Sequence, residues 1–222
     1  MHQHILIVGA GFSGMWAALS AARLVDKYQS ENIKITVIAP QPELRIRPRF
    51  YENAVSTLVA PLQPLFDITG VNFLRGTVRQ ILPDSKEVRW TDASGETRVS
   101  RYDRMVLASG SHVDRSQVAG AQTHAFDLDQ LESAAVLERH LQGLAYQAES
   151  EARNTVVVCG GGFTGIEMAL ELPGRLRDIL GVDAKTRVVV VERSTEPGAC
   201  YSEALRNIII EASCGTGRGV DR

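Results

Sequence analysis

A short apolar run leads directly into a glycine-rich turn near the start of the chain: Ile5-Leu6-Ile7-Val8-Gly9-Ala10-Gly11-Phe12-Ser13-Gly14. The apolar run has the length and composition of a buried strand, and residues 15–24 continue with apolar and alanine positions over several helical turns. A second β-branched run, residues 33–38, ends at Ala39-Pro40, because proline cannot continue a central strand. The chain therefore opens with a strand, a helix and a second strand.

The spacing Gly-x-Gly-x-x-Gly between a strand and a helix is typical of a dinucleotide-binding turn. The first glycine permits the tight turn, the second leaves room for a pyrophosphate, and the third lets the helix pack on the strand. The helix N-terminus then presents free N–H groups and a partial positive charge to the phosphates. The alternative is a glycine turn with a purely structural role. We predict that this turn binds a dinucleotide through Gly9, Ala10, Gly11, Phe12, Ser13 and Gly14.

The same pattern recurs in the second half of the chain. Residues 155–159 form a strand-like run, residues 187–191 form another, and between them lies the turn Gly160-Gly161-Gly162-Phe163-Thr164-Gly165. Two strand–helix–strand units of this kind predict two nucleotide-binding layers, so we expect an α/β protein with two Rossmann-like domains built on parallel sheets.

Glu192 follows the last strand of the second unit. A carboxylate at this point can accept both ribose hydroxyls of an adenosine, and its charge disfavours a 2′-phosphate, so NADH is favoured over NADPH. The adjacent Arg193 could offset this preference. A surface glutamate without a ligand role is the alternative. The first unit has no acid at the corresponding strand end.

The segments between the two units are expected to be less regular. Residues 41–67 contain four prolines and predict a covering loop, with a short helix over residues 50–58. Short strand-like runs predict a small antiparallel insertion at residues 71–73, 78–82, 87–91 and 97–99. Further expected elements are a parallel-type strand at 103–108 and helices at 128–146, 163–172 and 202–212, with Pro173 ending the second helix. The glycine-rich residues 213–222 supply no third strand, so the second domain is expected to be incomplete.

Composition excludes several other classes of protein. The 222 residues are 44% apolar and 23% charged, as in an ordinary globular chain, and the net charge of -2 gives no surplus for binding nucleic acid. No apolar run is long enough to span a membrane, and an apolar run beginning near His4 leaves no room for a signal peptide, so we expect a cytoplasmic protein. Cys159, Cys200 and Cys214 have neither metal-ligand nor disulfide spacing.

The order of motifs resembles the two-dinucleotide-domain flavoproteins of the pyridine nucleotide-dependent FAD oxidoreductase family, and among them the type II NADH dehydrogenases. Besides the two glycine turns, the similar stretches are Arg47-Pro48-Arg49-Phe50-Tyr51-Glu52-Asn53-Ala54, Gly76-Thr77-Val78, the stretch from Tyr102 to Ser111, and Ile166-Glu167-Met168-Ala169. The Tyr102 stretch carries Ser109 where the family usually has threonine.

The resemblance implies FAD at the first turn and NAD(H) at the second. It also implies cofactor contacts for Arg47, Val78, Ala108, Ser109 and Gly110, and it places Glu167 near the flavin and nicotinamide rings. Residues 40–60 contain no cysteine, which excludes the disulfide reductases. For Arg47 the alternative is a solvated loop, and for Glu167 it is a first-turn acid that complements the helix dipole.

The expected domains are the FAD-binding part at residues 1–112, a connecting segment at 113–153, an incomplete NAD(H)-binding domain at 154–212 and an irregular tail at 213–222. The resemblance implies hydride transfer from NADH to the flavin and electron transfer onward to a quinone or another small acceptor, in a protein that looks C-terminally truncated. Any peripheral membrane association would belong to a full-length parent. The alternative is a non-catalytic dinucleotide-binding fragment.

Overall fold

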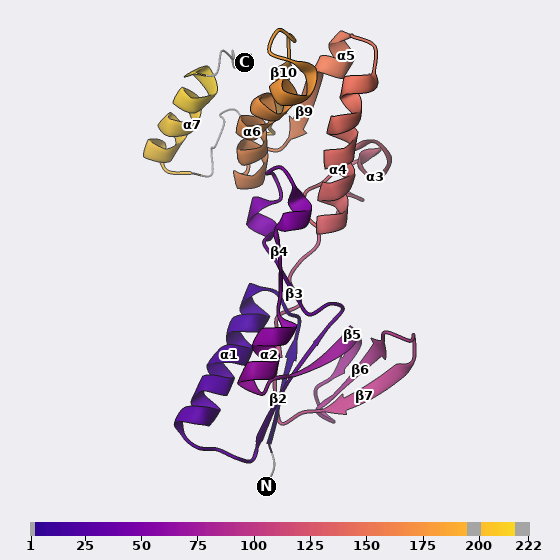
Figure 1. Cartoon of the computed structure of the whole chain (residues 1–222), viewed down its shortest axis with the longest axis vertical. Coiled ribbons are helices and arrows are strands. Elements are labelled where there is room, and N and C mark those ends of the chain that lie inside the picture. Colours follow the sequence, from indigo (N-terminus) through magenta and orange to yellow (C-terminus); the bar gives the residue numbers. More distant parts are fainter. Residues whose placement is uncertain (1–2, 195–200, 216–222) are drawn as a thin grey trace. The chain divides into compact units, whose positions relative to one another are not determined.

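The computed structural model describes residues 3–194 and 201–215 (Figure 1). By its internal packing the chain divides into two compact units. The first comprises residues 1–46 and 59–113, and the second comprises residues 47–58 and 114–222. The assignment of one dinucleotide to each part of the chain remains a prediction.

The first unit is built on a six-stranded sheet in the order β7-β6-β5-β2-β1-β8. Strands β1, β2, β5 and β8 run parallel to one another, whereas β6 and β7 continue the sheet antiparallel. The bounds are β1 (Gln3–Val8), β2 (Ile33–Ala39), β5 (Asn72–Leu82), β6 (Glu87–Asp92), β7 (Thr97–Arg101) and β8 (Arg104–Leu107). The α/β class, the parallel sheet and the antiparallel addition are confirmed.

Strand β5 differs from the prediction of two separate pieces. It is one continuous strand that pairs parallel with β2 through residues 72–75 and antiparallel with β6 through residues 76–82. A bulge between Val78 and Gln80 shifts the register within the second half. The predicted break fell at residues 74–77, which contain Gly76 and span the point where β5 changes its partner from β2 to β6.

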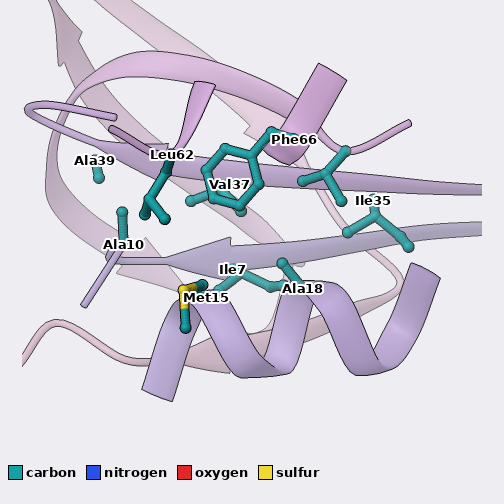
Figure 2. Close-up of a cluster of buried hydrophobic side chains, with 10 residues drawn as sticks. Ile7, Ala10, Met15, Ala18, Ile35, Val37, Ala39, Leu62 and Phe66 are labelled. Atoms are coloured by element: carbon teal, nitrogen blue, oxygen red, sulfur yellow. The ribbon is translucent and has the colours of Figure 1, made fainter. Parts of the chain in front are cut away.

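Neighbouring residues of a strand point to opposite sides of the sheet, and both faces of the parallel sheet are covered by apolar packing. On one face, Ile7 packs with Met15 and Ala18 of α1 (Phe12–Lys27) and with Phe66 of α2 (Gln63–Thr69), as Figure 2 shows. On the other face, Leu6 packs with Val88 and Trp90 of β6 and with Ile38 of β2. The β5–β6–β7 meander therefore takes the place of a second helical layer.

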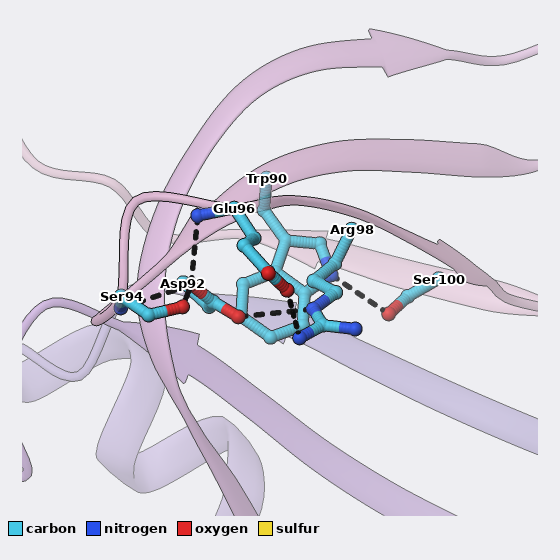
Figure 3. A network of polar contacts seen from close by, with 6 residues as sticks. All are labelled: Trp90, Asp92, Ser94, Glu96, Arg98 and Ser100. Carbon is cyan, nitrogen blue, oxygen red and sulfur yellow. Dashed lines mark hydrogen bonds and ion pairs between the residues drawn. The ribbon is translucent and has the colours of Figure 1, made fainter.

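A polar network closes the turn between β6 and β7. The Asp92 carboxylate accepts hydrogen bonds from the Ser94 hydroxyl at 2.6 Å, the Glu96 backbone N–H at 3.0 Å and the Arg98 Nε at 2.9 Å (Figure 3). These bonds and the Arg98 charge stabilise the ionised form, so the pKa of Asp92 lies far below its ordinary value.

The proline-rich region has more structure than expected. Strands β3 (Glu43–Arg45) and β4 (Val59–Pro61) form an antiparallel pair, followed by α2. Pro64 lies in the first turn of α2. A backbone N–H at this point has no acceptor within a helix, so proline costs no hydrogen bond there. The helix predicted over residues 50–58 is wrong: this stretch contains only the short 3-10 turn η2 (Val55–Thr57), after η1 (Arg47–Arg49).

The second unit contains a parallel pair of strands, β9 (Thr155–Cys159) and β10 (Arg187–Val191), joined through α6 (Phe163–Leu180). Its apolar core joins Leu137 and Leu141 with Met168, Leu172 and Leu176. The remaining elements are α3 (Ala121–His124), α4 (Leu131–Gly143), η3 (Leu144–Tyr146), α5 (Glu151–Asn154) and α7 (Glu203–Gly215). Residues 213–215 thus extend α7, and the rest of the expected tail lies outside the described residues.

Helix α6 runs through Pro173, so the prediction that this proline ends the helix is wrong. An interior proline costs about 3 kcal/mol in helix stability. Burying a leucine contributes about 1.5–3 kcal/mol, and Leu172 and Leu176, on either side of the proline, are both fully buried. Packing of the helix face therefore outweighs the local penalty. In the part of the chain described, no helix combines the length and apolar character that crossing a bilayer requires.

Candidate functional site

The first glycine turn has the tight geometry that the motif predicts. Gly9 has φ +106°, a conformation that favours glycine, and its N–H donates to the Ile38 carbonyl at 2.9 Å. A Cβ on Gly14 would lie 2.0 Å from the Gly9 carbonyl oxygen, so helix α1 can approach the turn only with glycine at that position. The first and third glycines are therefore required by the protein's own packing.

Gly11 is different, because a Cβ at this position would meet nothing within 4 Å. Gly11 is also the N-cap of α1, which has no side-chain cap and no acid in its first turn. The helix N-terminus thus offers uncapped N–H groups next to open space, which is the arrangement that binds a phosphate. Phe12 and Ser13 are exposed beside it, whereas the Ala10 side chain is buried in the core and could bind a cofactor only through its backbone.

The topology of the sheet places this turn where ligands bind in open α/β sheets. The chain proceeds from β1 to β2 and β5 on one side, and β8 lies on the other side of β1. The carboxyl ends of β1 and β8 therefore flank the point at which strand order reverses. Ala108, which follows β8, donates to the Val8 carbonyl at 2.8 Å, and its own carbonyl closes over Gly9. Ser109 and Gly110 follow at this edge.

The second glycine turn repeats the backbone geometry of the first. Gly160 has φ +108° and donates to the Val191 carbonyl at 2.8 Å. A Cβ on Gly165 would lie 2.0 Å from the Gly160 carbonyl oxygen, whereas one on Gly162 would meet nothing within 4 Å. Gly162 caps α6 without a side-chain bond, and no acid lies in the first turn. Two turns with one geometry confirm that the motif is repeated in structure as well as in sequence.

One difference separates the two turns. The Cβ position of Gly160 is open, whereas that of Gly9 is closed by the Ala108 carbonyl. The first turn has β8 as a neighbour of its strand, and in the described residues the second sheet consists of β9 and β10 alone. Phe163 is exposed beside the second turn, and its ring lies tilted against that of Tyr201, with 4.3 Å between the centroids. Thr164 is exposed next to it.

Glu192 lies beside the second turn, and its predicted contact with a ribose remains a prediction. Its Oε2 accepts the Gly161 backbone N–H at 2.5 Å, and its Oε1 accepts the Ser194 N–H at 3.1 Å. The hydrogen bond from Gly161 has the largest effect on Glu192, and that from Ser194 adds to it. Both lower the pKa of Glu192 and keep it ionised. The turn thus carries a fixed negative charge directly beside it.

Glu167 lies in the second turn of α6 and is half-buried. Its charge acts on Tyr51 of the same unit. Burial raises the pKa of the Tyr51 phenol, and the negative charge of Glu167 raises it further. Tyr51 belongs to residues 47–58, a segment that packs within the second unit. The sequence pattern did not reveal this proximity, because the two residues are more than a hundred positions apart.

The remaining predicted site residues have clear protein partners. The Arg47 guanidinium forms an ion pair with Asp129. The Val78 side chain packs against the apolar cluster of Leu6, Ile38 and Trp90. Cofactor contacts by these two residues remain predictions.

Two residues that sequence reasoning missed are Arg175, which binds the Tyr51 carbonyl, and Glu138, which binds the Ala54 N–H. The recurrence of charged residues at 167, 171 and 175, one helical turn apart, was the available signal.

The fold and the two turns together define a class of protein with two dinucleotide-binding layers. At each turn, the open Cβ position of the middle glycine and the uncapped helix fit a pyrophosphate. The sequence profile described as pyridine nucleotide-disulphide oxidoreductase matches residues 3–217. The chain belongs to this family.

Named relatives agree with this assignment. An NADH dehydrogenase-like protein of Mycobacterium tuberculosis is 37% identical over 217 residues, which cover 96% of this chain and 53% of that protein. A type II NADH:quinone oxidoreductase of Staphylococcus aureus is 26% identical, covering 91% of this chain and 52% of that protein. The chain spans about half the length of these relatives.

A solved structure shares the fold. NDH2 from Plasmodium falciparum in complex with NADH superposes with a TM-score of 0.82, at 15% sequence identity, over 99% of this chain and 48% of that chain.

Proposed function

We propose that this chain carries the FAD and NADH sites of an NADH dehydrogenase-like oxidoreductase, with FAD at residues 9–14 and NADH at residues 160–165. The observation that carries the proposal is the twice-built glycine turn, each with an uncapped helix N-terminus and open space at its middle glycine. The names of the relatives from M. tuberculosis and S. aureus support NADH as the reductant.

The chemistry supplied by the bound cofactors is hydride transfer from the nicotinamide to the flavin. The protein's part is to bind and to orient. The N–H groups at the start of α1 and of α6 bind the pyrophosphates, and Ala108, Ser109 and Gly110 line the edge beside the first turn. No nucleophilic side chain is needed for this step.

Glu192 supports NADH as the nucleotide rather than NADPH. Its carboxylate is held ionised beside Gly161, and a second negative charge on a 2′-phosphate would be repelled there. Glu192 Oε2, which accepts the Gly161 N–H, still has a lone pair that can accept a hydrogen bond from a ribose hydroxyl.

The acceptor that we propose is a quinone or another small oxidant. This part of the proposal rests on the NADH:quinone oxidoreductase of S. aureus, which matches 91% of the chain.

A second candidate is a nucleotide-binding chain without turnover. Val157 of β9 and Val190 and Val191 of β10 are each more than a third exposed, although they lie in parallel strands that are normally covered on both faces. Leu107 of β8 is exposed in the same way. Strand faces left uncovered in this way favour the second candidate, because an open site would bind a nucleotide without positioning it for reaction.

A pair of matched variants tests the sites separately. Gly11→Asp places bulk and negative charge at the first turn and should abolish binding of FAD while leaving NADH binding intact; Gly162→Asp should do the reverse. FAD is measured by its retention through gel filtration, and NADH by the change in its fluorescence on titration. If Gly11→Asp retained FAD as the wild type does, or if Gly162→Asp bound NADH unchanged, the assignment of that turn would be refuted.

A further inference from the structure

A buried arginine connects helix α6 to residues 47–58, which we call the strap. Arg175 is only 3% exposed, and its Nη1 donates to the Tyr51 carbonyl at 2.9 Å. Its Nε is buried and, among the described residues, has no hydrogen-bond partner. Burying a guanidinium is unfavourable, and here burial lowers the pKa of Arg175, although Glu138 and Glu171 act in the opposite direction. The Tyr51 carbonyl in the strap therefore accepts a hydrogen bond from a buried cation.

The strap has two further anchors within the second unit. Arg47, at its start, pairs with Asp129, and the Ala54 N–H donates to Glu138 of α4 at 2.7 Å. Phe50 and Val55 are almost fully buried. The strap contains no regular helix or strand beyond the turns η1 and η2, so these contacts take the place of backbone pairing.

Arg175 lies on α6, the helix that begins at the glycine turn proposed for NADH. Glu167, Glu171 and Arg175 are spaced four residues apart, so they share one face of α6. The glycine turn proposed for NADH is at the start of the same helix, one turn before Glu167. Besides burial, the charges of Glu167 and Glu171 raise the pKa of the Tyr51 phenol, whose backbone carbonyl binds Arg175. A single rigid element therefore carries the nucleotide turn and the anchor of the strap.

We propose that Arg175 is a positioning residue: through the Tyr51 carbonyl it holds the strap on the α6 face that carries Glu167, and it thereby couples the strap to pyridine nucleotide bound at the start of α6. The coupling rests on the proposed NADH site, whereas the anchoring does not. Loss of the guanidinium leaves a carbonyl without its donor, and the strap then opens more often.

Hydrogen exchange of the full 222-residue chain without ligand tests the anchoring. The variants are Arg175→Gln, Arg175→Lys, which keeps a charge and a donor, and Arg177→Gln, a control at an exposed position of the same helix. We expect the amides of residues 50–58 to exchange about tenfold faster in Arg175→Gln, and at nearly the wild-type rate in the other two. Unchanged exchange in Arg175→Gln, or an equal increase in Arg177→Gln, would overturn the proposal.

The lysine variant decides the matter if Arg175→Gln fails to fold. Rescue of strap protection by Arg175→Lys supports positioning, since one donor at that point suffices. An Arg175→Lys protein that loses protection throughout residues 114–194 overturns it, because Arg175 would then be needed for the fold as a whole.

Added NADH tests the coupling. We expect NADH to slow exchange of the strap severalfold in the wild type and in Arg175→Lys but not in Arg175→Gln, with NADH affinity changed by less than about threefold. NADH binding without any change in the strap overturns the coupling. Absence of NADH binding in the wild type refutes the proposed NADH site instead, and the ligand-free comparison still decides the role of Arg175.

Discussion

The Glu192 carboxylate accepts a hydrogen bond from the backbone N–H of Gly161, with 2.5 Å between Oε2 and the nitrogen. This bond ties the end of β10 to the turn before α6, and it lowers the pKa of the carboxylate that makes it. The charge is therefore part of the turn itself. In Rossmann-like sites an acid at this strand end binds the adenosine ribose, so nucleotide choice is the property that we expect Glu192 to control.

Glu192→Gln should weaken the discrimination between NADH and NADPH. The amide can still accept from Gly161 but carries no charge, so we expect the ratio of the two dissociation constants to fall by about tenfold. Titration of both nucleotides by fluorescence measures the ratio. Glu149→Gln, an exposed change elsewhere in the second unit, is the control. An unaltered ratio in Glu192→Gln would remove Glu192 from the site.

Substitutions of two neighbouring glycines should separate binding from folding. Gly11→Ala adds a methyl group in open space and should change the free energy of unfolding by no more than about 1 kcal/mol, while weakening FAD binding at least about tenfold. Gly14→Ala drives a Cβ into the Gly9 carbonyl and should destabilise the first unit by about 3 kcal/mol or more.

Urea unfolding and FAD titration of both variants give the two quantities. Equal loss of stability in Gly11→Ala and Gly14→Ala would contradict the distinction between a ligand-facing and a packing glycine.

The glycine turns were predictable because their determinants are local. Strand, glycine spacing and helix are contiguous at both Gly9 and Gly160, and the structure repeats one geometry at the two sites. The end of α6 was not predictable in this way. Pro173 is a strong local signal for termination, and it is outweighed by the burial of Leu172 and Leu176 against α4, which local sequence does not reveal.

The strap shows the same limit. Residues 50–58 looked helical in isolation, but the strap is held by Asp129, Glu138 and Arg175. These residues are 82, 84 and 124 positions away from their partners Arg47, Ala54 and Tyr51. No periodicity within the segment encodes such contacts. Continuous strand β5 was divided in the prediction at residues 74–77, where it contains Gly76 and changes its partner from β2 to β6.

Gly174→Ala should stabilise the second unit by about 0.5–1 kcal/mol. Gly174 lies exposed inside α6, and a Cβ there meets nothing within 4 Å, so the substitution reduces only the freedom of the unfolded chain. Gly181→Ala is the matched contrast: Gly181 ends the same helix with φ +93°, which alanine adopts poorly, and it should be destabilising. Opposite signs in urea unfolding are expected, and a destabilising Gly174→Ala would contradict the description of α6.

Asp92→Asn should lower the melting temperature at neutral pH. The variant loses the charge that Arg98 and the Ser94 hydroxyl stabilise. Because folding lowers the pKa of Asp92 below its ordinary value of 3.8, the stabilisation is fully present above that value and is lost as the pH falls below it. The difference between wild type and variant should therefore shrink in acid.

Thermal unfolding between neutral and strongly acidic pH measures this dependence. Asp84→Asn, in the neighbouring turn of the meander, is the control and should show little difference at any pH. A gap between Asp92→Asn and wild type that stays constant into acid would show that the Asp92 charge does not stabilise the turn.

The measurement that tests the central claim most directly is the visible absorption spectrum of the FAD-loaded chain before and after anaerobic addition of NADH. If one polypeptide holds both dinucleotides in working positions, the flavin absorption bands should be present and should bleach when NADH is added. A chain that retains FAD and binds NADH but keeps its flavin bands, or one that retains no FAD, would contradict the claim.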